Sequence, residues 1–242
     1  MASAKQHYEE LLSDVYSWMF GGFESGVQRN AAFFERLGIR PRGSATAFDL
    51  GAGCGFQSIP LARLGFAVTA VDLDQKLLQE LVAHLGPHSV STVQDDLLDF
   101  DRYVEGPVEL VVCMTDTILH LESKQDVRRL FRKVHAALEP GGRFIVTFRD
   151  LSQELTDLDR FLPVRADDTT IFTCFLEYEP ASVKVHDLVY RKQDGAWRLH
   201  KSYYRKLRLS REWVATELLA AGFADVDMDV AQGGMIAAVA SR

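Results

Sequence analysis

The chain of 242 residues is poor in the residues that mark disulfide-bonded, zinc-binding and nucleic-acid-binding proteins. It has three cysteines, widely spaced and without a C-x-x-C pair, which indicates a reducing compartment and no zinc site: Cys54, Cys113 and Cys174. The formal net charge of -7 argues against a nucleic-acid partner, because such binding depends on Lys and Arg that neutralise phosphates. We therefore expect neither a metal nor a nucleic acid to bind.

Long apolar runs are missing as well. No run approaches the length of a membrane span, and the N-terminus lacks a basic region followed by an apolar stretch, so we expect no membrane partner and a cytoplasmic location. No Pro-, Ser- or Gly-rich linker and no internal repeat divides the chain. We expect one domain, residues 1–242, with a helical cap (1–40), a core (41–150), a β insert (151–208) and a C-terminal helix with the last strands (209–242).

The most informative segment, Phe48 to Asp74, combines alternating glycines with an acidic residue on either side. Ala45–Leu50 is apolar enough for a buried parallel strand, and the glycines after it let the backbone turn tightly and approach a ligand: Gly51, Gly53 and Gly55. A helix is expected from about Phe56 to Leu64, followed by a second buried strand at Ala67–Val71. The pattern predicts a small-molecule cofactor site.

Two kinds of nucleotide site place a glycine loop after the first strand. A dinucleotide fingerprint spaces its glycines G-x-G-x-x-G and offers helix N-terminal amides to a pyrophosphate. Here the third glycine comes one residue early, and the Asp49 carboxylate would oppose a pyrophosphate. That carboxylate would suit a ligand with a cationic head, such as the ammonium and sulfonium of S-adenosylmethionine. The charge favours the methyl donor.

The run D-L-G-A-G-C-G (49–55), with D-L-D (72–74) at the end of the second strand, resembles the first two motifs of class I S-adenosylmethionine-dependent methyltransferases. The resemblance implies an α/β fold: a Rossmann-like, seven-stranded, doubly wound sheet with an antiparallel β insert after the fifth strand. It also implies S-adenosylmethionine as the cofactor and predicts that Asp72 binds the ribose hydroxyls. The donor contacts expected in this segment are Asp49, Gly51, Ala52, Gly53, Gly55, Asp72 and Leu73.

The segment T-V-Q-D-D-L-L-D-F (92–100) looks like the third-strand segment of this family. In that segment an acidic residue faces the adenine amino group, and an apolar neighbour packs on the ring. Asp96 fits the acidic position best, Asp95 is possible, and Leu97 is the apolar neighbour. A helix-starting or loop aspartate is the structural alternative.

Val108–Met114 is the next apolar run, and a polar cluster follows it. Ligands of open α/β sheets gather at the carboxyl ends of the strands, so we expect Met114 and Thr115 to contact the donor. The block C-M-T-D-T-I-L-H-L (113–121) is similar to the fourth motif of glycine and sarcosine N-methyltransferase-like enzymes, where an asparagine commonly replaces Asp116. Asp116 and His120 are candidate proton acceptors or substrate orienters, with a capping or core role the alternative for His120.

The rest of the chain alternates helix and strand and then becomes rich in β signals. Ser123 and Asp126 predict a helix N-terminus, Pro140-Gly141-Gly142 ends that helix, and Arg143–Phe148 follows as a strand. Three β-rich segments, the last two joined by Asp194-Gly195, predict the antiparallel insert: 171–178, 183–190 and 197–207. Ser210 begins a last helix, with strands at 224–230 and 235–240.

Three further predictions concern residues outside these motifs. Arg149 ends the fifth strand, and in the glycine N-methyltransferase-like pattern an arginine in this block holds the acceptor's carboxylate; an ion pair with Asp150 is the alternative. In a helix expected over His7–Met19, Tyr16 and Trp18 are placed near the donor. A basic group is interpreted as a solvated strand edge: Lys201, Arg205, Lys206, Arg208 and Arg211.

The sequence thus predicts methyl transfer from S-adenosylmethionine to a small-molecule acceptor, which carries an acid group if Arg149 acts as a clamp. Two alternatives stay open: an S-adenosylmethionine-binding module without turnover, and a nucleotide-dependent oxidoreductase. Neither the acceptor atom nor the oligomeric state follows from these residues.

Overall fold

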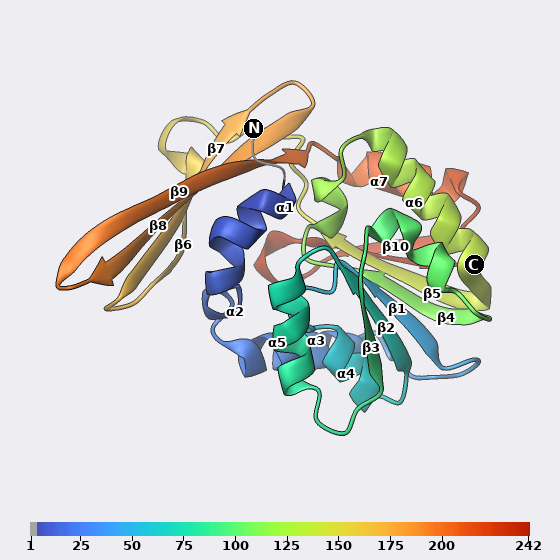
Figure 1. Ribbon diagram of the computed structural model, residues 1–242. Coiled ribbons are helices and arrows are strands. Elements are labelled where there is room, and N and C mark those ends of the chain that lie inside the picture. Colours follow the sequence, from blue (N-terminus) through green and yellow to red (C-terminus); the bar gives the residue numbers. More distant parts are fainter. Residues whose placement is uncertain (1–3) are drawn as a thin grey trace.

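The computed structural model describes residues 4–242, so the first three positions of the expected cap and domain lie outside the described residues. Its centre is a seven-stranded sheet with the order β10-β11-β5-β4-β1-β2-β3 (Figure 1). Strands β1 to β5 are parallel, and β11 runs antiparallel to both β5 and β10. The strands are β1 Thr46–Leu50, β2 Ala67–Asp72, β3 Val90–Gln94, β4 Val108–Cys113, β5 Leu138–Phe148, β10 Asp225–Val230 and β11 Ile236–Ser241. The predicted Rossmann-like sheet is confirmed.

Helices cover both faces of this sheet, as a doubly wound fold requires. Helices α3 Phe23–Arg36, α4 Ser58–Arg63 and α5 Gln75–His84 pack on one face. The other face is covered by η3 Leu97–Tyr103, α6 Lys124–Ala137 and α7 Arg211–Ala220. Every residue of β4 is buried, because the central strand has helices on both sides.

Two helix starts that the sequence predicts are confirmed by their caps. The Ser123 hydroxyl accepts a hydrogen bond from the Asp126 amide at 3.2 Å, and the Ser210 hydroxyl accepts one from the Trp213 amide at 3.1 Å. Helix α4 begins at Ser58 rather than near Phe56, because the preceding residues complete the glycine turn.

The fifth strand begins earlier than predicted. Leu138 already pairs with Val108, and a register shift follows before the pairing resumes at Arg143. The Pro140-Gly141-Gly142 segment therefore forms an irregularity inside β5 rather than a turn before it.

The N-terminal segment is helical, as expected, but it is not one regular helix. It consists of α1 Ala4–His7, a π-helical turn η1 Tyr8–Leu12, a 3-10 turn η2 Ser13–Val15 and α2 Tyr16–Met19. The Ser13 hydroxyl donates to the Tyr8 carbonyl at 2.9 Å and to the Asp74 carboxylate at 2.5 Å. These bonds tie the middle of the segment to the start of α5 and accompany its departure from α-helical geometry.

The predicted antiparallel insert is confirmed as a second sheet with the order β6-β7-β8-β9. Its strands are β6 Phe161–Ala166, β7 Thr170–Tyr178, β8 Ser182–Gln193 and β9 Ala196–Leu207, with the short turn η5 Asp157–Arg160 before them. Asp194 and Gly195 form the hairpin turn with φ values of 51° and 78°. Strand β6 was not predicted, because Pro163 weakens a strand pattern, yet Pro is tolerated on an edge strand.

The N-terminal helices lie between the insert and the central sheet (Figure 1). Leu11, Leu12 and Val15 pack against Phe172 and Val189 of the insert. Two further short turns are η4 Thr117–His120 and η6 Gln232–Gly234. Within residues 4–242, no helix is long and apolar enough to cross a membrane.

Candidate active site

A cavity of about 820 Å³ lies at the carboxyl ends of β1 to β4. The loops that follow those four strands form one wall, the N-terminal cap supplies a second, and the insert supplies a third. Parallel strands bring their carboxyl ends to one edge, so residues far apart in the chain meet there. Ten of the expected residues line it: Tyr16, Gly51, Gly53, Asp72, Leu73, Asp95, Asp96, Leu97, Thr115 and His120.

The three glycines of the loop after β1 have different tasks. All three have positive φ, at 73° for Gly51, 53° for Gly53 and 89° for Gly55. A Cβ on Gly51 would lie 2.3 Å from Thr117, and one on Gly55 would lie 2.5 Å from Leu81, so packing alone demands glycine at both positions. A Cβ on Gly53 would meet its nearest atom, in Tyr16, at 3.6 Å. Gly53 is thus the loop glycine at which a Cβ would extend into the cavity without a clash.

Asp72 connects the loops after the first two strands. Its Oδ2 accepts a hydrogen bond from the Gly53 amide at 2.7 Å, and its Oδ1 accepts one from the Asp74 amide at 2.8 Å. Burial raises the pKa of Asp72, although these amide bonds oppose the rise. Its carboxylate therefore fixes the glycine loop while lining the cavity.

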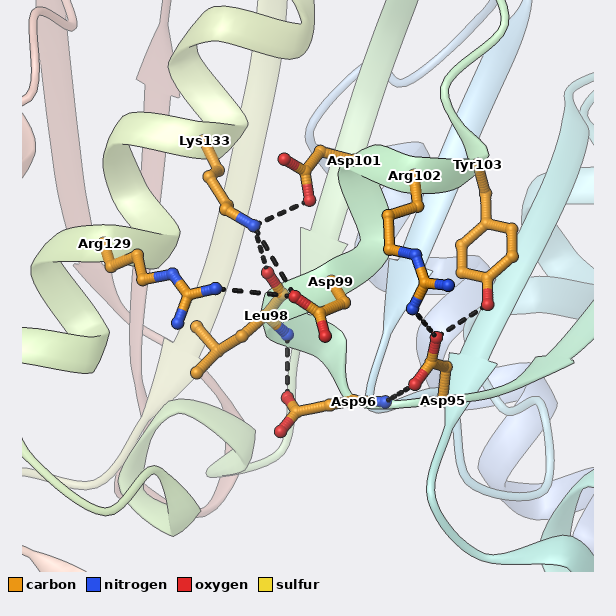
Figure 2. A network of polar contacts seen from close by, with 9 residues as sticks. All are labelled: Asp95, Asp96, Leu98, Asp99, Asp101, Arg102, Tyr103, Arg129 and Lys133. Carbon is orange, nitrogen blue, oxygen red and sulfur yellow. Dashed lines mark hydrogen bonds and ion pairs between the residues drawn. The ribbon is translucent and has the colours of Figure 1, made fainter.

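The two acids after β3 are held differently, as Figure 2 shows. Asp95 accepts hydrogen bonds from the Tyr103 hydroxyl at 2.6 Å and from Arg102 at 3.3 Å, and the Tyr103 bond contributes most to its lowered pKa. Asp96 uses one carboxylate oxygen to accept from the Leu98 amide at 2.8 Å and so begins η3. Asp96 is therefore both a helix-starting aspartate and a cavity residue.

The turn after β4 is strained. Thr115 and Asp116 have φ values of 59° and 70°, in the left-handed region that non-glycine residues rarely adopt. Thr147 on the neighbouring strand holds both: its hydroxyl accepts from the Thr115 amide at 2.7 Å, and its carbonyl accepts from the Asp116 amide at 3.1 Å. Such strain costs about 1–3 kcal/mol per residue and is typical of functional sites.

This turn places the buried Asp116 carboxylate between two cations. Lys206 Nζ lies 2.7 Å from Asp116 Oδ2, and the Arg149 guanidinium contacts the same oxygen. The Arg149 amide donates to Oδ1 at 2.8 Å. Burial alone would raise the pKa of Asp116, but Lys206 and Arg149 outweigh it and lower the pKa to about 2.

His120 lies beside this charge cluster and is enclosed by aromatic rings. Its ring stacks on Tyr204 at 5.2 Å and meets the edge of Tyr8 at 5.7 Å. Burial, followed by the charge of Lys206, lowers the pKa of His120 to about 3. Its Nδ1 has no hydrogen-bond partner within the described chain. His120 is therefore neutral near pH 7.

The structure does not place seven of the expected residues on the cavity wall: Trp18, Asp49, Ala52, Gly55, Met114, Asp116 and Arg149. The Trp18 indole donates to Asp167 at 2.6 Å, which anchors it to the insert. Asp49 is buried beneath the loop, where it accepts from the Ser58 hydroxyl at 2.6 Å, and burial raises its pKa to about 7. Met114 belongs to the core between the sheet and α3. Asp116 and Arg149 lie next to the cavity rather than on its wall: Asp116 contacts both Arg149 and Lys206, and Lys206 lines the cavity.

The basic group near the end of the insert was misinterpreted in part. Lys206 is buried, and Arg208 donates to the carbonyls of Leu151, Ser152 and Glu179, so neither is a solvated edge residue. Reasoning from the sequence also missed Tyr8, whose ring lines the cavity. For Lys206 a signal was present: in the alternating strand β9 it shares a face with Tyr204, which is buried.

Comparison with known proteins finds similarity to methyltransferases. Residues 47–142 match the model of a methyltransferase domain. A glycine/sarcosine N-methyltransferase from Halorhodospira halochloris is 27% identical over 139 residues, which are 57% of this chain and 50% of that protein. These matches support a class I S-adenosylmethionine-dependent methyltransferase. The matched segments span between 20% and 54% of the length of the curated relatives that this chain matches first.

Solved methyltransferase structures share the fold over nearly the whole chain. The CcbJ methyltransferase from Streptomyces caelestis aligns with a TM-score of 0.78 at 23% identity, covering 98% of each chain. CalS10 from Micromonospora echinaspora, an amino pentose methyltransferase with bound S-adenosylmethionine, aligns with a TM-score of 0.74 at 17% identity over 90% of this chain and 91% of its own. At these identities the likeness shows the fold.

The residues on the cavity wall fit the cofactor of this family, S-adenosylmethionine. The volume of about 820 Å³ is within the range of small-molecule sites. Gly53 leaves open the space that a side chain would fill, between Tyr16 and Leu77. Three carboxylates, from the ends of two neighbouring strands, line the same cavity and can accept hydrogen bonds from the hydroxyl and amino groups of an adenosine: Asp72 after β2, and Asp95 and Asp96 after β3.

Proposed function

We propose that this protein transfers the methyl group of S-adenosylmethionine to the nitrogen of a small amine that also carries an acid group. The supporting observation is the Lys206 end of the cavity, where two cations surround one buried carboxylate. The relatives named above act on glycine and sarcosine or on an amino pentose, as their names state, which supports a small amine as acceptor.

We assign the donor to the loops after β1, β2 and β3. Asp72 would accept hydrogen bonds from the ribose hydroxyls, Asp96 or Asp95 would accept one from the adenine amino group, and Leu97 would pack on the ring. The bound cofactor supplies a methyl group on a sulfonium, which is already activated toward attack. The residues of this chain therefore have to position the acceptor and exclude water.

The charges at the other end of the cavity favour an anionic group on the acceptor. Asp116 carries one negative charge, whereas Lys206 and Arg149 carry two positive charges, so the cluster has a surplus positive charge. Lys206 lines the cavity, and about half of the Arg149 side chain is exposed and can donate further hydrogen bonds. The proposed clamp is therefore Lys206 together with Arg149, rather than Arg149 alone.

The pKa values in the site favour nitrogen as the acceptor atom. A hydroxyl acceptor needs a general base with a pKa near the working pH. The lowered pKa values of about 2 for Asp116 and about 3 for His120 make both groups weak bases at neutral pH. An acceptor that has lost its ammonium proton to solvent before it binds attacks without such help: the N–C bond forms as the sulfonium S–C bond breaks, and the product leaves as a methylated ammonium. The unprotonated ring of His120 can accept a hydrogen bond from the N–H of the amine and orient the lone pair.

The first experiment offers S-adenosylmethionine with a labelled methyl group and pooled metabolites, and mass spectrometry reads the label. Any acceptor found is then compared with its amide, which lacks the acid group, and with the corresponding hydroxy acid, which lacks the amine. We expect at least a tenfold lower kcat/KM for the amide and no transfer to the hydroxy acid. Equal rates for the acid and the amide would contradict the anion clamp. Donor binding without transfer to any metabolite would instead support a binding module.

The second experiment asks whether Lys206 recognises the acid group. Lys206→Met should abolish the preference for the acid over its amide, whereas Lys206→Arg should retain most of it, because it retains the charge. Lys184→Met is the matched control, since Lys184 is also ion-paired, to Glu177 at 2.6 Å, but does not line the cavity. Donor affinity, measured by calorimetry, should stay unchanged in all three variants.

A further inference from the structure

A second cavity, of about 470 Å³, lies at the amino ends of the parallel strands, at the edge of the sheet opposite the candidate active site. Within residues 4–242, the two cavities share no lining residue. Leu110, Arg143 and Ser241 line the second cavity from paired positions on β4, β5 and β11. The rest of its wall comes from the segment before β1, from Phe66 before β2 and from the irregular part of β5. A ligand in this cavity would therefore be separate from the donor and the acceptor.

Two arginines in this cavity are not neutralised by an ion pair. Arg42 is exposed, and the half-buried Arg143 donates to the Leu37 carbonyl, at the end of α3, at 3.4 Å. In the part of the chain that the structure describes, neither guanidinium lies within ion-pair distance of a carboxylate. Burial lowers the pKa of Arg143, and the charge of Arg42 lowers it further, although Glu109 opposes this shift. The two guanidiniums are thus close enough to repel each other.

The two glutamates of the cavity are bonded to the backbone instead. Glu109 accepts three hydrogen bonds from amides of residues 42–45, at 2.6, 3.0 and 2.9 Å. Glu139 accepts one from the Ser44 amide at 3.3 Å. These bonds hold the segment before β1 against the sheet and stabilise both carboxylates. They leave the two arginines without a direct partner.

We propose that this cavity binds a small ligand through a phosphate or carboxylate group held between Arg42 and Arg143. A guanidinium can donate two parallel hydrogen bonds to such a group, and a negative charge between two guanidiniums removes their repulsion. Ser241, beside Arg143 on the neighbouring strand, offers a hydroxyl, and Phe66 offers apolar surface to the rest of the ligand. The volume of about 470 Å³ suits a small metabolite.

The experiment titrates the protein with inorganic phosphate and, separately, with malonate, at an ionic strength held constant with sodium chloride. Calorimetry should show saturable binding of at least one of the two anions, with a Kd of about 1 mM or lower. Arg42→Met and Arg143→Met should each weaken this binding roughly tenfold or more, because each removes a charged hydrogen-bond donor. Arg42→Met keeps the backbone amide that bonds to Glu109, so this variant should retain the fold.

Arg63→Met is the matched control. Arg63 belongs to α4, lies 3.9 Å from Glu24 and does not line the cavity, so the affinity for the anion should not change.

A third variant tests the sign of the electrostatic effect. Glu139→Gln should bind the anion about threefold more tightly, because it neutralises a carboxylate that opposes the ligand. The glutamine can still accept the hydrogen bond from the Ser44 amide, so the loop should stay in place. Arginines with only a structural role would not make this variant bind more tightly.

Three results would overturn the proposal. The first is the absence of saturable binding of either anion at roughly ten times the expected Kd. The second is a folded Arg42→Met variant with the affinity of the wild type. The third is binding that Lys206→Met abolishes and Arg143→Met leaves unchanged, because the anion would then occupy the candidate active site.

Discussion

At the scale of single residues, the donor half of the cavity depends on backbone positions and on one carboxylate. Gly53 is the loop glycine whose missing side chain leaves cavity space, whereas Gly51 and Gly55 are fixed by packing against Thr117 and Leu81. Asp72 holds the Gly53 amide in place from the next strand. Burial raises the pKa of both Asp49 and Asp72: the pKa of Asp49, which accepts from the Ser58 hydroxyl, rises to about 7, whereas two amide bonds oppose the rise at Asp72.

We expect Gly53→Ala to lower donor affinity at least tenfold. The added Cβ would stand between Tyr16 and Leu77, which both line the cavity. Gly38→Ala is a matched control, because Gly38 has a similar φ of 60° with no atom within 4 Å of a Cβ. Both variants should lose about 1–2 kcal/mol of stability from left-handed strain, measured by urea unfolding. Calorimetry with the donor separates them, and equal affinities would remove Gly53 from the donor site.

We expect the stability difference between Asp49→Asn and the wild type to depend on pH. Folding raises the pKa of Asp49 from 3.8 to about 7. The stabilising contribution of Asp49 to the free energy of unfolding is therefore fully present below pH 4 and is lost as the pH rises through 7. The asparagine of the variant cannot titrate. The free energy of unfolding of the variant, relative to that of the wild type, should therefore rise by up to about 4 kcal/mol from pH 4 to pH 8. Urea unfolding at several pH values measures this. The exposed Asp168→Asn should show no such trend, and a flat difference for Asp49→Asn would contradict the burial argument.

At the scale of elements, the cap, the insert and the core are joined by buried polar contacts. His7 on α1 pairs with Asp187 on β8 at 2.7 Å, and both side chains are almost fully buried. The Cys174 thiol donates to the other Asp187 oxygen at 3.0 Å. Because Tyr8 follows His7 directly and lines the cavity, this pair also fixes part of the cavity wall.

We expect His7→Ala to loosen the cap without unfolding the core. The substitution leaves the buried Asp187 with only the Cys174 thiol, and loss of a hydrogen-bond partner from a buried polar group costs about 1–3 kcal/mol. In hydrogen exchange, amides of residues 4–19 should exchange at least tenfold faster, whereas those of β1 and β4 should not change. Glu10→Ala, an exposed position in the same segment, is the control. Unchanged exchange in the cap would show that apolar packing alone holds it.

At the scale of the whole molecule, the cavity is shared by three parts of the chain: the core, the cap and the insert. A ligand that contacts all three is bound by the folded state alone, so its binding free energy adds to the free energy of unfolding. The site is thus expected to couple donor binding to the stability of the entire protein.

We expect demethylated S-adenosylmethionine at a hundred times its Kd to stabilise the protein by about 2.7 kcal/mol, a rise in Tm of about 5–10 °C for a chain of this size. Asp72→Ala removes a charged acceptor, which should weaken affinity by roughly ten- to a hundredfold and reduce the rise in Tm at the same ligand concentration. Differential scanning calorimetry measures both. An equal rise in the two proteins would exclude Asp72 from the donor site.

Much of the fold could be predicted because its signals are local. Apolar runs marked the buried strands, Ser123 and Ser210 marked helix starts, and the Asp194-Gly195 pair marked the hairpin. Each of these depends on residues that are neighbours in the chain. Strand β6 and the irregular cap escaped prediction, because edge position and a hydrogen bond from Ser13 to the distant Asp74 decided them.

The sequence by itself determined the sheet, the glycine loop and the acids that follow the parallel strands, since the parallel strands β1 to β5 bring their carboxyl ends to one edge. Only the tertiary structure decided which charged groups lie in contact. Lys206 meets Asp116 across 90 positions of the chain, and burial together with that contact sets the pKa values of Asp116 and His120. Desolvation and electrostatic interaction depend on distance in space, so a one-dimensional pattern contains neither.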